Sequence, residues 1–282
     1  MQTVNRIDPL RDAVEALRRD GPVALVPTMG ALHEGHLTLM REARRRAAHV
    51  VASIFVNPRQ FGAGEDLDAY PRRLAEDSAL LAAEGVSLLW APDAAEMYPA
   101  GYATTISVSG ISEGLCGATR PGHFDGVATV VCKLFNQVRP DLALFGEKDW
   151  QQLAVIRRMA RDLDLTLPHA GAILGVPTVR EADGLAMSSR NAYLTAAERT
   201  AAAALPRAMR EAIAAIAAGR TVDAALAELT ATVRAAGFAG VDYAALCDAD
   251  SLAPLAVRGS APARLLVAAR IGRARLIDNM PA

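Results

Sequence analysis

Short apolar runs alternate with helical segments between residues 8 and 178, and this alternation constrains the fold more than any other feature. The runs lie at 23–26, 49–56, 86–90 and 141–145. Continuous apolar runs of this length are typical of strands buried on both faces of a parallel sheet. The helical segments supply the crossover connections that parallel strands require. We therefore predict an α/β fold built on a doubly wound parallel sheet.

The pattern changes near residue 178. Two alanine-rich helices are predicted at 196–217 and 221–236, and consecutive strands follow them. The expected strands of this part lie at 241–247, 264–271 and 274–278. Shorter strands are expected earlier in the chain, at 104–108 and on both sides of 175–180. Helices followed by strands indicate a small α+β unit. The sequence thus predicts two domains, at 1–178 and 179–282.

Composition excludes several classes of protein. The chain has 282 residues, a hydrophobic content of 52% and a net charge of −1, which argues for a packed core and against broad nucleic-acid or membrane binding. No stretch approaches the roughly 18 apolar residues of a membrane span, and the N-terminus lacks an apolar signal region. Its three cysteines, Cys116, Cys132 and Cys247, are far apart, as expected in a reducing compartment. We expect a cytoplasmic protein.

Polar clusters follow three of the predicted strands. His33 and His36 come after the first strand, Asn57 and Gln60 after the second, and Lys148 after the fourth. Carboxyl ends of parallel strands meet at one edge of the sheet, where ligands bind in open α/β folds. Helices begin after the first and last of these clusters, and helix N-termini favour phosphate. We therefore predict a phosphate site at this edge.

The residues alone leave several roles open. His33 and His36 can bind a metal, cap the turn or bind phosphate, and the HxxH spacing with an internal glycine favours phosphate. Lys148 and Lys133 are the two lysines among 30 basic residues, and a lysine supplies a compact point charge. Lys148 can neutralise phosphate or pair with a neighbouring carboxylate, whereas the role of Lys133 is not settled. Asp149 can hold Mg²⁺ or cap a helix.

Five motifs occur in order along the chain. They are PTMGALHEGH at 27–36, FVNPRQF at 55–61, RPGHF at 120–124, FGEKDWQQL at 145–153 and VPTVREADGLAMSSRN at 176–191. Together they resemble the pantothenate synthetase (pantoate–β-alanine ligase) family, and the resemblance continues to LIDN at 276–279. HxGH and MSSR are similar to degenerate signatures of class I aminoacyl-tRNA synthetases, which belong to the same nucleotidyltransferase superfamily. Trp150 replaces the Phe or Tyr expected after GEKD.

The resemblance implies a Rossmann-like ATP- and pantoate-binding domain at 1–178, a smaller C-terminal lid domain at 179–282, and a homodimer. It also implies the reaction. Pantoate attacks the α-phosphate of MgATP to give pantoyl adenylate and pyrophosphate, and β-alanine then displaces AMP to give pantothenate, on the route to coenzyme A. Adenylation converts a carboxylate into an acyl donor with a good leaving group.

The resemblance further implies roles for individual residues. ATP contacts are expected at Met29, Gly30, Ala31, Leu32, His33, Glu34, Gly35, His36, Gly146, Glu147, Lys148, Asp149, Val179, Met187, Ser188, Ser189 and Arg190. Of these, the catalytic set is His36 as proton donor, His33 as phosphate ligand, and Lys148, Ser188, Ser189 and Arg190. Gln60 and Gln152 match the amides that hold pantoate, with Gln60 also assigned to β-alanine, and Asn57 is expected to contact substrate beside them. Asp149 and Asp77 are candidate Mg²⁺ ligands, although Asp77 also fits a solvated helix face.

Two rival interpretations remain for the sequence. A cytidylyltransferase-type enzyme shares HxGH but does not explain FVNPRQF or the glutamines of GEKDWQQ. A non-catalytic nucleotide-binding regulator is disfavoured because His36, Lys148 and Arg190 are all present.

Overall fold

The computed structural model describes residues 1–62 and 64–282, which form two compact units. The first unit contains 1–147 and 152–177, and the second contains 148–151 and 178–282. The segment 148–151 is separated in sequence from the rest of the second unit. It belongs there because Lys148 and Trp150 make hydrogen bonds with residues of that unit.

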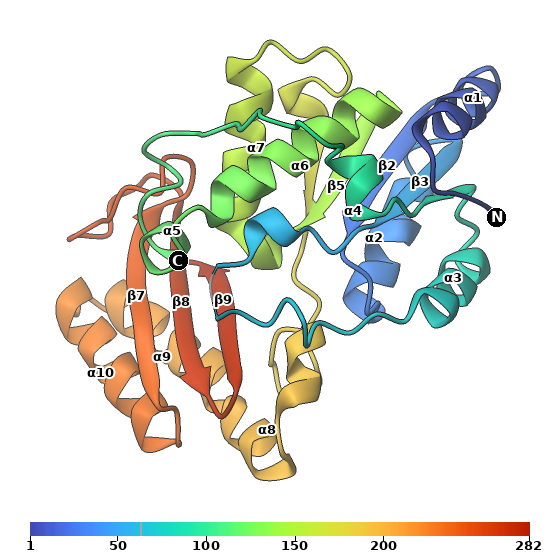
Figure 1. Ribbon diagram of the computed structural model, residues 1–282. Helices are drawn as coiled ribbons and strands as arrows, with labels where there is room; N and C mark the ends of the chain where they lie inside the picture. Colours follow the sequence, from blue (N-terminus) through green and yellow to red (C-terminus); the bar gives the residue numbers. More distant parts are fainter. Residues whose placement is uncertain (63) are drawn as a thin grey trace. The chain divides into compact units, whose positions relative to one another are not determined.

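A six-stranded parallel sheet forms the centre of the first unit (Figure 1). Its strands are β1 (Gln2–Val4), β2 (Val23–Thr28), β3 (His49–Ile54), β4 (Leu88–Trp90), β5 (Leu142–Gly146) and β6 (Ile173–Val176). Their order is β1-β4-β3-β2-β5-β6, and every pair is parallel. From β2 the chain adds β3 and β4 on one side, and it later adds β5 and β6 on the other. The predicted doubly wound sheet is confirmed.

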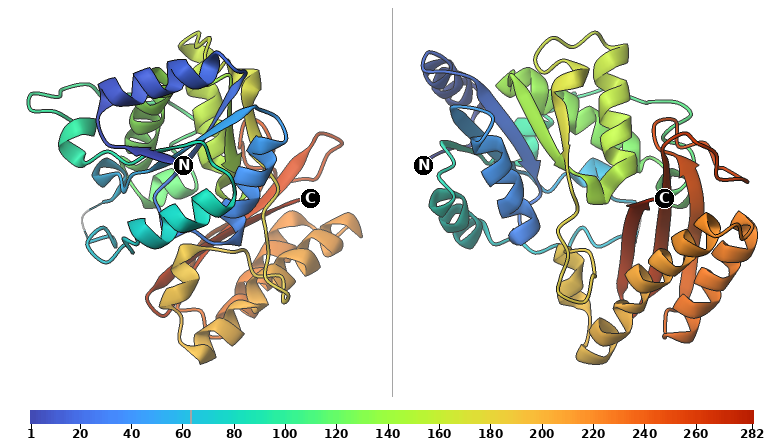
Figure 2. Two further views of the ribbon diagram at one scale, coloured as in Figure 1. Left: turned by 90° about the vertical axis from the view of Figure 1, so that its right-hand side faces the viewer. Right: turned by 180° about the vertical axis from the view of Figure 1, so that it is seen from behind.

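Helices connect the strands of this sheet (Figure 2). They are α1 (Ile7–Arg18), α2 (Glu34–Arg44), α3 (Leu74–Ala83), α4 (Ala94–Met97), α5 (Cys116–Thr119), α6 (His123–Val138) and α7 (Trp150–Asp162), whose first two residues belong to the second unit. Helix α1 packs against α6, and α2 packs against α3. Because crossovers between parallel strands are right-handed and the direction of winding reverses at β2, these two pairs cover opposite faces. Leu39, Met40 and Ala43 of α2 are buried against the sheet.

Some short elements differ from the prediction. β1 was not expected, and it forms because its three residues find β4 as a parallel partner. The expected strand at 104–108 is absent because this extended segment has no partner strand, and the amide of Ile106 donates instead to Thr129 Oγ1 at 2.9 Å. Two strands are expected on either side of 175–180, but the structure has a strand on one side, β6, which ends at Val176. On the other side, Arg180 makes only an isolated bridge to Ala186.

The second unit has an antiparallel sheet in the order β7-β8-β9 with helices on one face (Figures 1 and 2). Its elements are β7 (Gly240–Asp248), β8 (Ala263–Ile271), β9 (Ala274–Pro281), α8 (Ala196–Ala202), α9 (Ala204–Ala217) and α10 (Val222–Ala235). The helix predicted at 196–217 is therefore two helices. Pro206 explains the break, because it has no N–H to donate to the carbonyl of Ala202. Leu205 and Met209 of α9 pack with Leu265 and Val267 in the core.

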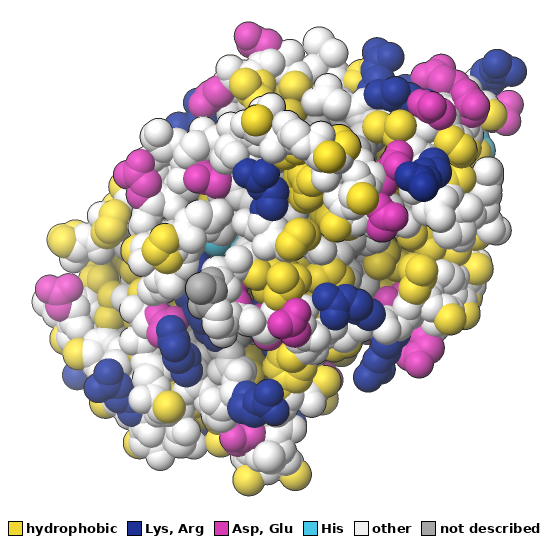
Figure 3. Space-filling model, viewed as in Figure 1, with side chains coloured by type: hydrophobic (Ala, Val, Ile, Leu, Met, Phe, Trp, Pro, Cys, Tyr) yellow, Lys and Arg dark blue, Asp and Glu magenta, His cyan; other side chains and the backbone are white. Residues whose placement is uncertain are grey.

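Charges of both signs are mixed at the surface. On the face seen in Figure 3, basic side chains are interspersed with acidic ones rather than gathered in one patch. Many of the arginines make ion pairs, such as Arg41 with Glu34 and Glu84. Within 1–62 and 64–282, no helix combines the length and the apolar character that crossing a bilayer would require.

Gly126 lets α6 approach the 3₁₀ turn η1 (Pro58–Gln60) closely, and Gly126→Ala should destabilise the protein. An added Cβ would lie 2.2 Å from the carbonyl oxygen of Arg59 and 2.7 Å from Cα of Gln60. We expect a loss of about 1–3 kcal/mol in urea-induced unfolding, despite the better helix propensity of alanine. Gly240→Ala is the control, because its Cβ meets nothing within 4 Å. Equal stabilities of the two variants would contradict this packing argument.

Candidate functional site

A buried carboxylate shapes the loop that follows β2. Asp77 of α3 is 2% exposed, and its two oxygens accept hydrogen bonds from the amides of Ala31 and Leu32, each at 2.9 Å. These bonds hold Gly30 and Ala31 in left-handed conformations, with φ of +82° and +52°. An added Cβ on Gly30 would come within 2.9 Å of Asp77 Oδ2, so glycine is required there. Asp77 therefore does not lie on a solvated helix face.

His33 and His36 form the start of α2. His33 is the N-cap, its Nδ1 accepts from the amide of Gly35 at 3.2 Å, and the amide of His33 in turn donates to His36 Nδ1 at 3.3 Å. The rings lie close, with centroids 4.1 Å apart. Because each Nδ1 accepts a backbone hydrogen bond, each neutral ring carries its proton on Nε2. The capping role is thus present, and it orients two imidazole donors at a helix N-terminus.

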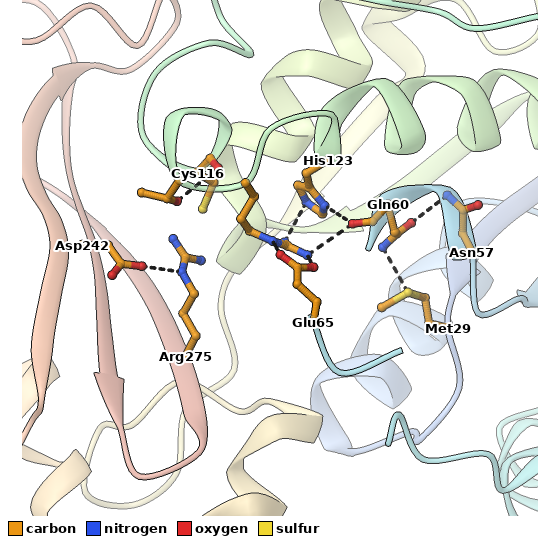
Figure 4. A network of polar contacts seen from close by, with 10 residues as sticks. Met29, Asn57, Gln60, Glu65, Cys116, His123, Asp242 and Arg275 are labelled. Atoms are coloured by element: carbon orange, nitrogen blue, oxygen red, sulfur yellow. Dashed lines mark hydrogen bonds and ion pairs between the residues drawn. The ribbon is translucent and has the colours of Figure 1, made fainter. Parts of the chain in front are cut away.

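Asn57 and Gln60 lie at the end of β3, the strand adjacent to β2 (Figure 4). Asn57 is 1% exposed, and its side-chain amide donates to Gln60 Oε1 and to the carbonyl of Gly126, both at 3.1 Å. Gln60 Nε2 donates to the sulfur of Met29 at 3.1 Å. The two neighbouring strand ends are therefore linked through side chains. Asn57 acts both as the N-cap of η1 and as the group that fixes the amide of Gln60.

A charged network holds the main chain of Gln60 (Figure 4). His123 Nδ1 donates to the carbonyl of Gln60 at 2.8 Å, so its neutral ring accepts at Nε2 from Arg120, 3.1 Å away. Arg120 also donates to the Gln60 carbonyl and makes an ion pair of 2.6 Å with Glu65. Burial alone raises the pKa of the Glu65 carboxyl, but the hydrogen bond and charge of Arg120 hold this pKa below its ordinary value of 4.5.

Two cations lie over two tyrosine rings beside Asn57. Lys133 Nζ is 4.7 Å from the ring centre of Tyr102, and the Arg59 guanidinium is 5.5 Å from that of Tyr98. The hydroxyl of Tyr98 donates to Asn57 Oδ1 at 2.8 Å. Burial lowers the pKa of Lys133 and raises that of Tyr98. Lys133 is thus part of the packing around Asn57 rather than a residue of a solvated helix face.

Lys148 lies in the 3₁₀ turn η2 (Glu147–Asp149), directly after β5. Its ammonium is 3.8 Å from Asp149 Oδ2, too far for a tight ion pair, and the Asp149 carboxylate is 44% exposed. Trp150 follows, with its indole N–H donating to the carbonyl of Ala249 at 2.9 Å and the Arg264 guanidinium stacked 3.5 Å over its ring. Trp150, at the position where an aromatic residue is expected, therefore packs and hydrogen-bonds within the second unit.

The segment 179–191 folds back on itself. The amide of Met187 donates to the carbonyl of Val179 at 3.0 Å, and a turn at 181–184 closes the end. Ser188 caps the 3₁₀ turn η4 (Ser189–Tyr193), and its hydroxyl accepts from the amide of Arg190. Val179 and Met187 are therefore neighbours, and Ser188, Ser189 and Arg190 occupy one short turn.

The structure brings several predicted residues together within each unit. In the first unit, Met29 contacts Gln60, which contacts Asn57, while Gly30–His36 form the loop and helix start beside them. Gln152 lies on α7 and is partly buried. In the second unit, Lys148, Ser188 and Asp278 line one small cavity. Within the described ranges, no cluster of three or more His, Cys, Asp or Glu residues that could hold a metal is found.

Sequence reasoning missed the residues that support the site. Glu65, His123, Tyr98 and Asn279 each contact a residue 41 or more positions away, as in the pairs Tyr98–Asn57 and Asn279–Lys148. RPGHF was recognised as a motif, but no local pattern indicates that Arg120 and His123 bind the carbonyl of Gln60. These roles depend on tertiary contacts alone.

Comparison with known proteins identifies relatives over the full chain. The family model described as Pantoate-beta-alanine ligase matches residues 2–281. Pantothenate synthetase of Novosphingobium aromaticivorans is 72% identical, covering 99% of this chain and 98% of its own. The crystal structure of pantothenate synthetase from Thermus thermophilus superimposes with a TM-score of 0.92 at 50% identity and covers 99% of each chain.

A further solved relative contains ligands. Pantoate-beta-alanine ligase from Francisella tularensis, described as complexed with Beta-gamma ATP and Beta-alanine, has a TM-score of 0.84 at 32% identity. The match covers 100% of this chain and 97% of the Francisella chain.

Glu65→Gln should lower stability in a pH-dependent way. The folded-state pKa of Glu65 lies below 4.5, so its ion pair with Arg120 stabilises the fold above that pH, and this stabilisation is lost as the pH falls through the folded-state pKa. We expect a loss of about 1 kcal/mol at pH 7 that shrinks towards zero below pH 4.5, measured by urea unfolding at a series of pH values. Glu76→Gln, which removes an exposed pair, should change little. A pH-independent difference would contradict the assignment.

Proposed function

Since the chain belongs to the pantoate-beta-alanine ligase family, we propose that it condenses pantoate with β-alanine to pantothenate in a reaction that consumes ATP. The observation that carries this proposal is the family match over residues 2–281, which includes every motif of the candidate site. The hydrogen-bonded link between the histidine loop and the Asn57–Gln60 turn adds structural support.

The reaction proceeds in two steps. A pantoate carboxylate oxygen attacks the α-phosphorus of ATP, and the bond to the bridging oxygen breaks to release pyrophosphate. The β-alanine amine then attacks the acyl carbon of pantoyl adenylate, loses a proton and displaces AMP. The protein has to align the reactants and spread the negative charge that develops on the phosphates.

His33 and His36 donate hydrogen bonds to the phosphates of ATP. Their backbone-bonded Nδ1 atoms support this role, because each neutral ring then has an Nε2–H donor. His36 acts as the proton donor and His33 as a phosphate ligand. Met29–Leu32, Glu34 and Gly35 contact the nucleotide through a loop that Asp77 holds in shape.

Lys148 neutralises phosphate charge, since its ammonium lies 3.8 Å from the Asp149 carboxylate, too far for a tight ion pair. Ser188, Ser189 and Arg190 clamp phosphate from the short turn η4, because hydroxyl, amide and guanidinium donors are close together there. Val179 and Met187, which are paired through their backbones, contact the nucleotide, as do Gly146 and Glu147 at the end of β5.

Gln60 and Gln152 bind pantoate, and Gln60 also contacts β-alanine. Neutral amides suit these substrates, because they donate to a carboxylate and accept from a hydroxyl without trapping the product as an ion pair. Asn57 holds the carboxamide of Gln60 from its Oε1 side. Asn57 therefore assists substrate binding by orienting Gln60.

Mg²⁺ accompanies ATP in this proposal. The ion is bound in nucleotide sites through one or two carboxylates together with phosphate oxygens and water. Asp149 fits this requirement, because its carboxylate is exposed and adjoins Lys148. Asp77 fits less well, because both of its oxygens already accept backbone hydrogen bonds.

Further parts of the proposal come from the family resemblance. They are the division into an ATP- and pantoate-binding domain at 1–178 and a lid domain at 179–282, a homodimer, and a cytoplasmic location. A cytidylyltransferase activity is not proposed, because the Asn57–Gln60 turn and the family match are both accounted for by the ligase.

The purified protein should exchange radiolabelled pyrophosphate into ATP when pantoate is present and β-alanine is absent. Reversible formation of pantoyl adenylate requires this result. Pantoate should be replaced in turn by other hydroxy acids to define specificity. Exchange that strictly requires β-alanine would contradict the two-step mechanism.

Lys148→Ala should reduce pyrophosphate exchange by about 100-fold or more, because an electrostatic donor at a developing phosphate charge is worth roughly this much. The fold should be retained, since the ammonium, among the described residues, pairs with a single carboxylate, Asp149, at 3.8 Å. Circular dichroism checks the fold, and Arg161→Ala, which removes an exposed basic side chain of α7, serves as the control. Unfolding of the Lys148 variant would indicate a structural role instead.

A further inference from the structure

Two consecutive residues of β9 bind both segments that carry the proposed phosphate ligands of the second unit. Asp278 and Asn279 are 3% and 4% exposed. They are separated by 98 and 131 residues from the groups that they contact. Buried polar side chains at such positions are costly unless every polar atom is used. Their contacts therefore indicate what the pair does.

Asn279 uses both ends of its side-chain amide. Nδ2 donates to the main-chain carbonyl of Lys148 at 2.9 Å, and Oδ1 accepts from Arg264 at 2.6 Å. Arg264 in turn stacks on Trp150 at 3.5 Å. Asn279 thus links the main chain of Lys148 to Arg264, and Arg264 in turn holds the ring of Trp150.

Asp278 holds the other segment. Its carboxylate makes a two-point ion pair with Arg180, with distances of 2.7 and 2.9 Å. Arg180 also donates to the carbonyl of Gly184 at 3.0 Å and to the main-chain carbonyl of Asn279 at 3.3 Å. Arg180 lies at the base of the hairpin-like segment that leads to Ser188, and its bridge to Ala186 fixes that base.

We propose that Asp278 and Asn279 are positioning residues that set the relative placement of Lys148 and the Ser188–Arg190 turn for adenylation. This inference rests on the proposed function. The pair acts through the main-chain carbonyl of Lys148 and through Arg180, from the part of β9 that pairs with Leu266 and Val267 of β8.

This arrangement predicts that substitutions in the pair slow the first step of the reaction more than the second. Lys148 and the Ser188–Arg190 turn act on the phosphates of ATP, so their misplacement should affect formation of pantoyl adenylate most. Aminolysis of pantoyl adenylate that is supplied ready-made no longer involves pyrophosphate. A displacement of catalytic groups by about 1 Å can reduce a rate by about 100-fold.

The test is Asn279→Asp, which keeps the shape and the acceptor for Arg264 but removes the donor to Lys148. We expect pyrophosphate exchange to fall by about 10- to 100-fold, with less than about 3-fold loss in aminolysis of synthetic pantoyl adenylate by β-alanine. Asp278→Asn, which weakens the pair with Arg180, should show the same bias towards the first step.

Asp242→Asn is the matched control. Asp242 accepts from Arg270 and Arg275 at 2.9 and 2.7 Å in the same sheet, and neither ion pair includes a residue of the two segments. Figure 4 shows the pair of Asp242 with Arg275. Hydrogen–deuterium exchange supplies a readout that is independent of activity. Amides of residues 148–151 should exchange faster in Asn279→Asp than in the wild-type protein or in Asp242→Asn.

The outcomes separate the inference from the proposed function. A wild-type protein without pyrophosphate exchange would overturn the function, whereas faster amide exchange at 148–151 would still support the mechanical part of the inference. An active wild type combined with equal losses in both steps, or with losses no greater than in Asp242→Asn, would overturn the inference. Unfolding of both the Asn279 and Asp278 variants would also overturn it, because the pair would then serve the fold as a whole.

Discussion

Parallel pairing of β2 with β3 and β5 is the constraint on which the candidate site depends. Parallel strands end on the same side of a sheet, so the loop at 29–36, the turn at 57–60 and residues 146–147 all begin at one edge. Each of these segments carries polar side chains that would be remote from the others in an antiparallel arrangement. The chain winds outward from β2 in both directions, which is the topology that opens a crevice for ligands.

Side chains from distant elements then hold these loops in shape. Asp77 fixes two amides of the histidine loop, Asn57 orients Gln60, and Asn279 binds the carbonyl of Lys148. In each case a buried polar group is bonded to a loop backbone or to a side-chain amide. Loops without regular secondary structure must satisfy their backbone groups in this way. The supporting residues are therefore as important to the site as those that would touch substrate.

The chemistry of the site also fits a protein with little net charge. Formal charge is −1, and many arginines are used in ion pairs. Phosphate must therefore be met by local donors rather than by a broad basic surface. In the proposed function, the imidazole N–H groups of α2 in the first unit, and the ammonium of Lys148 and the donors of η4 in the second, are groups of this kind. Under the proposed function, the carboxamide of Gln60 supplies a neutral contact for a small organic acid.

The sequence by itself determined strands β2, β3, β4 and β5 of the first sheet, the location of the polar clusters and the family. Apolar runs such as 23–26 and 141–145 predict their strands because both faces of a parallel sheet are buried. Pro206 lies within the helix predicted at 196–217, which the structure divides at Ala203. Only the tertiary structure decided that β1 pairs with β4, that 104–108 is not a strand, and that Asp77, His123 and Asn279 support the site. The physical reason is that local patterns report which residues are buried, whereas the partner of a buried polar group depends on segments brought together by the fold.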